Sequence, residues 1–211
     1  MGFMQKSEQK RFSWLTGGPS AASNAPWDVE LCGTNRFAVV PSLGALVPGW
    51  SLVVPRRPMV SLRELSADEL GELVNLHTHV ADRLRAFGGT VFAFEHGSSA
   101  IGSVAGCGVD QAHLHLVPLG FNLVEWALAH NDDISWVKSA TAPLVNLPDE
   151  GEYVSVWEVG RTDGAVGNIR QPVSQWMRRL IACRLGIETQ WNYRTNPHLE
   201  NVQRTIQNFA T

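Results

Sequence analysis

The chain has 211 residues, of which 44% are hydrophobic and 18% charged, a balance that excludes wholesale disorder and fits one domain with or without an extension. No stretch approaches the roughly 18 consecutive apolar residues of a membrane span, so no membrane partner is expected. The formal net charge of -3 argues against a general affinity for nucleic acid, but it allows a local basic pocket for one phosphorylated small molecule.

The three cysteines, Cys32, Cys107 and Cys183, are odd in number, lie far apart and form no CxxC pair. This pattern favours neither a disulfide framework nor a thiolate zinc site. The first residues of the chain are interrupted by charges such as Lys6 and Glu8, unlike the apolar core of a signal peptide. We therefore expect a reduced protein in the cytoplasm.

Two short β-branched runs, at residues 36–40 and 50–54, are separated by proline and glycine and predict strands. A capping box formed by Ser66 and Glu69 then precedes apolar residues at three- and four-residue spacing. This pattern predicts a long helix, which a glycine pair at 88–89 ends.

Further strands are predicted at residues 91–94 and 112–117, on either side of a small-residue loop over 98–108. The order of strands, helix, strand, loop and strand favours an α+β fold with an antiparallel sheet and one long helix.

The chain changes character beyond Gly120, where a strand at 153–157 and helices at 172–185 and 199–209 predict a helical and strand extension. Gly and Pro residues interrupt the N-terminal stretch, which indicates an arm. We expect an arm, a central domain and an extension packed on that domain, over residues 1–27, 28–120 and 121–211.

Gln111, His113 and His115 alternate along the strand predicted at 112–117. Side chains two residues apart on a strand point to the same face, roughly 6.6–6.8 Å apart, which is the scale of adjacent phosphoryl groups. The loop before them is rich in residues without bulk, so its backbone N–H groups can approach phosphate oxygens closely. The three polar side chains are therefore candidates for a phosphate site.

Residues 106–118 read Gly-Cys-Gly-Val-Asp-Gln-Ala-His-Leu-His-Leu-Val-Pro and resemble the signature of the histidine-triad (HIT) superfamily, His-φ-His-φ-His-φ-φ with φ apolar. Residues 37–58 resemble the family's second and third strands, and residues 92–97 stand in the family's order. The resemblance covers about residues 28–120 and implies a HIT-like fold. It points to the diadenosine polyphosphate hydrolase-like branch, here with a C-terminal extension.

The resemblance implies a role for each matching residue. His113 would be the nucleophile that attacks the α-phosphorus of a nucleotide, held by the backbone carbonyl of Gly106. His115 would hydrogen-bond the transferred phosphoryl oxygens, and backbone N–H groups near Cys107 and Gly108 would share that task. A neutral imidazole is nucleophilic near pH 7, because its unperturbed pKa is about 6.5.

Several positions depart from the family's pattern. Gln111 replaces the first histidine of the triad, and an amide can donate a hydrogen bond to a bridging oxygen but cannot deliver a proton at neutral pH. Trp50 and Pro58 replace two upstream histidines, so Trp50 is expected either to stack on a base or to fill that space. Ser42 stands where related hydrolases often carry an acid that grips the ribose, and His96 is a candidate contact to substrate phosphate.

The sequence therefore favours an enzyme that hydrolyses or transfers a nucleotidyl group, with a dinucleoside polyphosphate-like substrate and no required cofactor. A divalent cation such as Mg²⁺ could accompany the polyphosphate. Many small members of the family are homodimers, so a homodimer is one option here.

Other interpretations stay open. The chain could be a binding or scaffold protein that keeps the fold without rapid turnover. His113 and His115 could hold a metal, with Glu95 and His96 as further ligands. Gln175 could reach a pocket from the tail helix or cap a packing face, and the same two options hold for Arg178, one turn further along.

Overall fold

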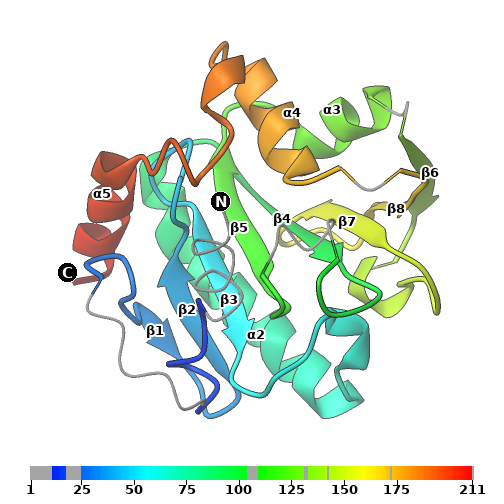
Figure 1. Ribbon diagram of the computed structural model, residues 1–211, viewed down its shortest axis with the longest axis horizontal. Helices are drawn as coiled ribbons and strands as arrows, with labels where there is room; N and C mark the ends of the chain where they lie inside the picture. Colours follow the sequence, from blue (N-terminus) through cyan, green and yellow to red (C-terminus); the bar gives the residue numbers. More distant parts are fainter. Residues whose placement is uncertain are drawn as a thin grey trace.

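The computed structural model describes residues 11–17, 25–103, 109–130, 133–141, 143–171 and 173–210. In this part of the chain, eight strands form one sheet in the order β1-β2-β3-β5-β4-β7-β8-β6, and every neighbouring pair is antiparallel (Figure 1). Their bounds are β1 Cys32–Gly33, β2 Phe37–Pro41, β3 Ser51–Pro55, β4 Thr90–Gly97, β5 Leu114–Leu119, β6 Ile134–Ser139, β7 Tyr153–Glu158 and β8 Gly164–Ile169. The predicted α+β class with an antiparallel sheet is confirmed.

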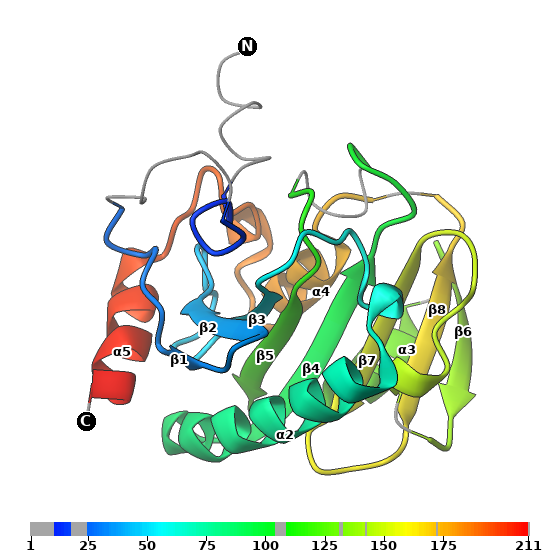
Figure 2. The same cartoon turned by 90° about the horizontal axis from the view of Figure 1, so that it is seen from below.

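The long helix α2, Ala67–Leu84, begins with the capping box expected at Ser66 and Glu69. The Ser66 side chain accepts from the Glu69 N–H, while the Glu69 carboxylate accepts from the Ser66 N–H. The helix lies across one face of the sheet, where its buried side chains meet those of the strands (Figure 2). Those side chains are Leu73, Leu76, His77, Val80, Ala81 and Leu84.

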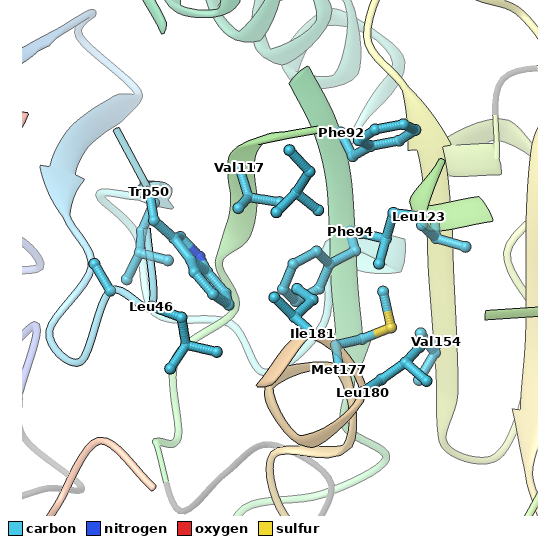
Figure 3. Close-up of a cluster of buried hydrophobic side chains, with 14 of the residues drawn as sticks. Leu46, Trp50, Phe92, Phe94, Val117, Leu123, Val154, Met177, Leu180 and Ile181 are labelled. Carbon is cyan, nitrogen blue, oxygen red and sulfur yellow. The ribbon is translucent and has the colours of Figure 1, made fainter. Parts of the chain in front are cut away.

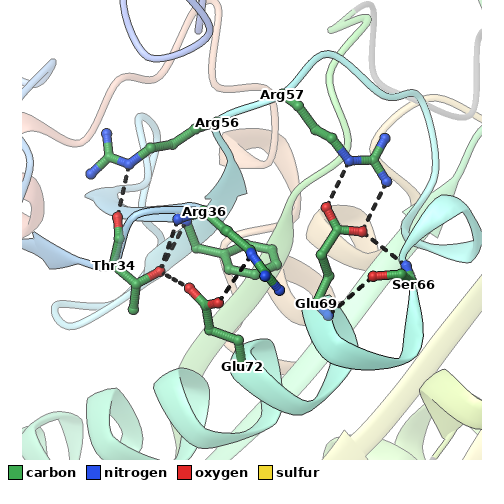
Figure 4. Close-up of polar contacts among 8 residues, drawn as sticks. Thr34, Arg36, Arg56, Arg57, Ser66, Glu69 and Glu72 are labelled. Carbon is green, nitrogen blue, oxygen red and sulfur yellow. Dashed lines mark hydrogen bonds and ion pairs between the residues drawn. The ribbon is translucent and has the colours of Figure 1, made fainter.

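Ion pairs and hydrogen bonds fasten this helix to the loops beside it (Figure 4). Arg57 donates to the Glu69 carboxylate at 2.8 Å, so the residue that caps α2 is also tied to the chain after β3. Glu72 accepts from the Thr34 hydroxyl and pairs with Arg36. Each such exposed pair contributes at most about 1 kcal/mol, so these contacts orient the helix more than they stabilise it.

The opposite face of the sheet is covered by α3, Leu123–Ala129, and by α4, Trp176–Arg184 (Figure 1). Their apolar side chains close a second core around Trp50 and Phe94 (Figure 3). The last helix, α5, Leu199–Ala210, packs near β2 and buries Val202 and Thr205. No helix in the described part of the chain is long and apolar enough to cross a bilayer.

The extension continues the sheet of the central domain. His96 in β4 pairs with Val154 in β7, and β8 and β6 follow outward. The strand expected at 153–157 is observed as β7, whereas the helix expected from 172 begins instead at Trp176. Strands β6 and β8 and helix α3 were not predicted. The pairing of β4 with β7 makes the extension and the domain one continuous sheet.

The described part of the N-terminal arm, residues 11–17, packs on the same face as α4. Phe12 is 3% exposed and Leu15 is 7% exposed, and both belong to the core around Trp50. Burying side chains of this size stabilises the contact by about 1.5–3 kcal/mol each, so the segment is anchored on the domain.

Candidate active site

A cavity of about 20 Å³ lies where β4, the start of β5, the arm and α4 meet. This volume is enough for about one water molecule. The described residues that line it are Arg11, Phe12, Leu52, Phe94, His96, Val109, His113, His115, Gln175, Arg178 and Tyr193. The cavity therefore combines the two histidines of the sequence motif with side chains from both ends of the chain.

The His113 ring is oriented by main chain. Its Nδ1 lies 2.8 Å from the carbonyl oxygen of Gln111. Because a carbonyl can only accept, Nδ1 carries the proton and Nε2 keeps its lone pair. Burial lowers the pKa of His113 to about 4, so the ring is neutral at pH 7. His113 thus has the protonation state that a nucleophile requires.

His115 has the opposite tautomer. The indole N–H of Trp50 donates to His115 Nδ1 at 3.0 Å, and an indole nitrogen cannot accept. The proton of the neutral ring is therefore on Nε2, which makes this atom a hydrogen-bond donor. The ring stacks on Phe94 with centroids 4.3 Å apart and lies 4.8 Å from the ring of His113. The His113 ring, with a lone pair on Nε2, therefore lies next to the His115 ring, with an N–H donor on Nε2.

Burial also moves the pKa of His115 well below its ordinary value. The same cause lowers the pKa of His96, a third histidine at the cavity, to about 3. His96 Nε2 accepts from the backbone N–H of Met177, in the first turn of α4, at 3.4 Å. The other ring nitrogen then carries the proton, and this buried Nδ1 has no hydrogen-bond partner among the described residues. The Nδ1–H of His96 is therefore a buried donor that no described residue satisfies.

Gln111 contributes to the site through its backbone. Its side-chain amide donates to the carbonyl oxygens of Pro55 and Arg57, at 2.9 and 3.0 Å, and does not line the cavity. The carbonyl that accepts from His113 is that of Gln111, whereas the resemblance implied the carbonyl of Gly106. Gly106, Cys107 and Gly108 lie outside the described residues.

Replacing Gln111 by alanine is expected to change stability more than turnover. The substitution leaves the carbonyl that orients His113 and removes the two hydrogen bonds to the end of β3, which costs about 1–3 kcal/mol. Urea unfolding should show this loss, and any kcat/KM should stay within about tenfold of that of the native protein. A fall in kcat/KM of a thousandfold with unchanged stability would contradict this structural role.

Two other expected contacts are buried and do not line the cavity. Trp50 is fully buried, with its N–H on His115 and the Arg178 guanidinium 4.5 Å above its ring. Ser42 is also fully buried, and its hydroxyl accepts from Arg178 at 2.6 Å. Both side chains therefore pack behind the residues that line the cavity and support their positions.

The tail helix does reach the cavity, which was one of two options open from the sequence. Arg178 lines it and donates to Ser42 and to the carbonyls of Leu43 and Gly44. Gln175 also lines it, with a left-handed backbone at φ 58° just before α4. Such a conformation is uncommon outside glycine and marks a constrained position.

The metal alternative lacks the ligands it needs. Successive residues of a strand face opposite sides, so Glu95 points away from His96. The Glu95 carboxylate accepts instead from the Leu62 N–H and the Tyr153 hydroxyl. Within the described ranges, no three His, Cys, Asp or Glu side chains gather as a metal site would require.

Comparison with known proteins agrees with the motif. Residues 31–122 match the HIT domain family. These residues form a HIT domain. The family predicted from residues 106–118 is thereby confirmed, over nearly the range that the resemblance covered. Three histidines of the HIT domain, at positions 96, 113 and 115, line the cavity together with Arg11 and Arg178, which stand outside the matched range.

Among solved structures, a match is the crystal structure of yeast Ap4A phosphorylase in complex with AMP. It is 12% identical, with a TM-score of 0.42, and the match covers 68% of this chain. The match spans about three fifths, 61%, of the yeast protein's chain. A search of curated proteins finds no match to this chain.

Proposed function

We propose that the chain is a nucleotide hydrolase or nucleotidyltransferase in which His113 is the nucleophile. The observation that carries this proposal is the hydrogen bond from His113 Nδ1 to the Gln111 carbonyl, which leaves Nε2 bare at the cavity. A neutral imidazole needs no further base to attack phosphorus, because its lone pair is already available.

The reaction has two steps. Nε2 of His113 forms a bond to the α-phosphorus, and the bond to the bridging anhydride oxygen breaks, so the leaving phosphate departs with the electron pair. Water or another acceptor then attacks the phosphorus and frees the imidazole. In both steps the Nε2–H of His115 donates to a phosphoryl oxygen, which stabilises the charge that spreads there.

The substrate class follows from the lack of a general acid among the described residues that line the cavity. Burial depresses the pKa of all three lining histidines, so none of them carries a proton to deliver at pH 7. Leaving groups that depart as stable anions, such as a nucleotide or polyphosphate, suit this site. We therefore propose a dinucleoside polyphosphate-like substrate.

The intermediate itself provides the test. The native protein is mixed briefly with diadenosine tetraphosphate, quenched, kept away from acid and measured by intact mass. We expect a mass increase of one nucleotidyl group, which peptide mapping places on His113. If the mass stays unchanged at every time point while substrate is consumed, the covalent route is wrong.

Discrimination between leaving groups is a second expectation. Diadenosine tetraphosphate should be cleaved at least about a hundredfold faster than an adenosine phosphoramidate, because amine departure requires a proton that general acids supply with a gain of about 10²–10⁴. The two substrates are compared by kcat/KM at pH 7. A faster reaction with the phosphoramidate would reveal a proton donor that we do not identify.

No residue of the described cavity requires a cofactor for this reaction. We expect Mg²⁺, where it contributes, to arrive bound to the polyphosphate. Cys32 and Cys183 are free thiols, which suits a reducing compartment, and we propose the cytoplasm as the location.

A second candidate is a nucleotide-binding protein without turnover. The observation in its favour is that Trp50 and Gln111, which replace two histidines of the family's pattern, are buried and do not line the cavity, so neither side chain supplies a catalytic group. Under this alternative, the native protein and His113→Ala bind nucleotide equally well and neither consumes it. Turnover by the native protein alone excludes this candidate.

A further inference from the structure

Two guanidinium groups flank the histidines from segments outside the HIT domain. Arg11 belongs to the arm and Arg178 to α4, and both line the cavity with His113. None of the described lining residues is acidic. Both arginines act on His113 electrostatically, since each contributes to the depression of its pKa. The cavity is therefore a region of concentrated positive charge.

Arg178 is held in a fixed position. Its side chain is buried, at 5% exposure, and donates to one hydroxyl and two backbone carbonyls in the turn after β2. The guanidinium also lies over the faces of Trp50 and Tyr193, at 4.5 and 5.6 Å from the ring centroids. These contacts orient the cation before any ligand arrives, so little ordering is lost on binding.

Arg11 is carried by an anchored but separable segment. Its guanidinium lies 5.1 Å from the ring centroid of Phe12, and that ring lies 5.7 Å from the ring of His113. Phe12 and Leu15 hold the segment in the core. A cavity of about 20 Å³ is smaller than a phosphoryl group, so a lining segment must move when a ligand enters, and the arm is a turn outside the strands of the sheet. The arm can then bring Arg11 back onto the bound ligand.

A third donor faces the same cavity. His96 lines it, and its protonated Nδ1 is buried without a hydrogen-bond partner among the described residues. An unsatisfied buried donor is costly, and an anionic oxygen is the acceptor that relieves this cost best. The donor and the two cations therefore select for the same kind of ligand.

We propose that Arg11 and Arg178 form a clamp for the two adjacent phosphoryl groups of a diphosphate-containing nucleotide. The involvement of this clamp in turnover rests on the function proposed above, whereas its affinity for diphosphate does not. Arg178 binds from its fixed position on α4, and Arg11 binds from the arm. The clamp stabilises the negative charge that the leaving phosphate gains when its bond to the α-phosphorus breaks.

The clamp is tested with inorganic pyrophosphate and calorimetry. The variants are Arg11→Gln and Arg178→Lys, and the control is Arg179→Gln, the next residue of α4, whose exposed guanidinium lies over Trp191 away from the cavity. We expect each clamp variant to bind pyrophosphate about 10- to 100-fold more weakly, because hydrogen bonds to charged groups are lost. The control should stay within about twofold, since such distant surface charges act weakly.

Turnover of diadenosine tetraphosphate distinguishes an arm that binds the ligand through Arg11 from an arm that only obstructs the cavity. If the arm carries a clamp, Arg11→Gln lowers kcat/KM by about a hundredfold, as removal of one oxyanion donor does elsewhere. A rise in kcat/KM would show that the arm only obstructs the site, and the proposal would be overturned. Arg11 stands in the arm, outside the sheet, so this variant remains informative even if Arg178→Lys fails to fold.

Failure of the clamp is distinct from failure of the proposed reaction. If the native protein turns over no nucleotide but loses pyrophosphate affinity in both clamp variants, the anion site stands and the reaction is wrong. If turnover proceeds while both variants bind pyrophosphate as tightly as the control, the reaction stands and the clamp is wrong.

Discussion

Replacement of His113 by alanine is expected to lower kcat/KM by at least about 10⁴-fold and to abolish the covalent intermediate, because the lone pairs of the other two histidines in the described cavity lining accept hydrogen bonds from Met177 and Trp50. The fold should survive, since His113 stands before β5 and takes no part in its ladder. The measurement combines steady-state kinetics on diadenosine tetraphosphate with intact mass after a brief reaction. Activity within tenfold of the native enzyme would remove His113 from the mechanism.

A matched control is available in the same chain. His130 is another ring held by a backbone carbonyl, with Nδ1 2.8 Å from the oxygen of Trp126, but it does not line the cavity of His113. His130→Ala should leave kcat/KM unchanged within about twofold, as substitutions away from the site do. Equal losses in both variants would indicate a general effect of removing a packed histidine.

The pH profile of the native enzyme adds a distinct expectation for the same residue. Burial lowers the pKa of His113 to about 4, so the ring stays neutral from pH 7 down to pH 5. The rate should therefore show no acid limb from this group in that interval. An acid limb near pH 6.5 that His115→Gln leaves in place would indicate a solvated His113.

The sequence predicted α2 well because all of its signals are local. A capping box, a periodic apolar face and two glycines specify a helix without reference to the rest of the chain. The alternation of His113 and His115 was also sufficient to bring both rings to one cavity. Short-range sequence patterns were therefore sufficient to predict both the helix α2 and the shared position of the two histidines.

The same alternation misled at Gln111, which stands three residues before β5, whereas His113 directly precedes the strand. A residue ahead of a strand need not follow its two-residue period, so the amide of Gln111 turned to Pro55 and its carbonyl to His113. Arg178 illustrates a different limit. Its contact with Gly44 spans 134 positions, and no local pattern encodes such a pairing.

Strand β8 was missed because its composition is unlike that of a strand. Glycines weaken β propensity, yet Gly167 is required by the packing of its neighbours. A Cβ atom there would lie 2.2 Å from a methyl carbon of Ile134 and 2.8 Å from the ring of Trp136. The glycine therefore reflects a close approach across β6 and β8 that only the folded sheet reveals.

Glu95 is expected to make the protein less stable as pH rises through neutrality, and Glu95→Gln should abolish this loss. The carboxyl is fully buried in β4, beneath Leu62 and Tyr153, on the sheet face opposite His96. Burial raises its pKa to about 7, and the hydrogen bonds it accepts only partly oppose this shift. Folding therefore favours the protonated form, unlike the unfolded chain with a pKa of 4.5.

The direction in which the free energy of unfolding changes with pH follows from the difference in bound protons between the folded and unfolded states. Between pH 4.5 and about 7 the folded state binds the proton that the unfolded chain has released, so the free energy of unfolding falls as pH rises. For a shift of this size, the fall is about 3 kcal/mol in total and is complete above pH 7. The buried histidines have the opposite sign, because their depressed pKa values reduce stability below pH 6.5.

The difference between the native protein and Glu95→Gln cancels the contribution of the histidines. Urea unfolding at pH 5, 6, 7 and 8 should give a difference that grows with pH in favour of the variant, by up to about 3 kcal/mol. The amide preserves the bonding, because it can donate to the Tyr153 oxygen while Tyr153 donates to Ser61, 2.9 Å away. Glu158→Gln, at the half-buried end of β7, is the control for losing a carboxylate that the core does not enclose. A difference independent of pH would mean that Glu95 is ionised in the folded protein throughout, with Tyr153 and the Leu62 N–H stabilising its charge fully.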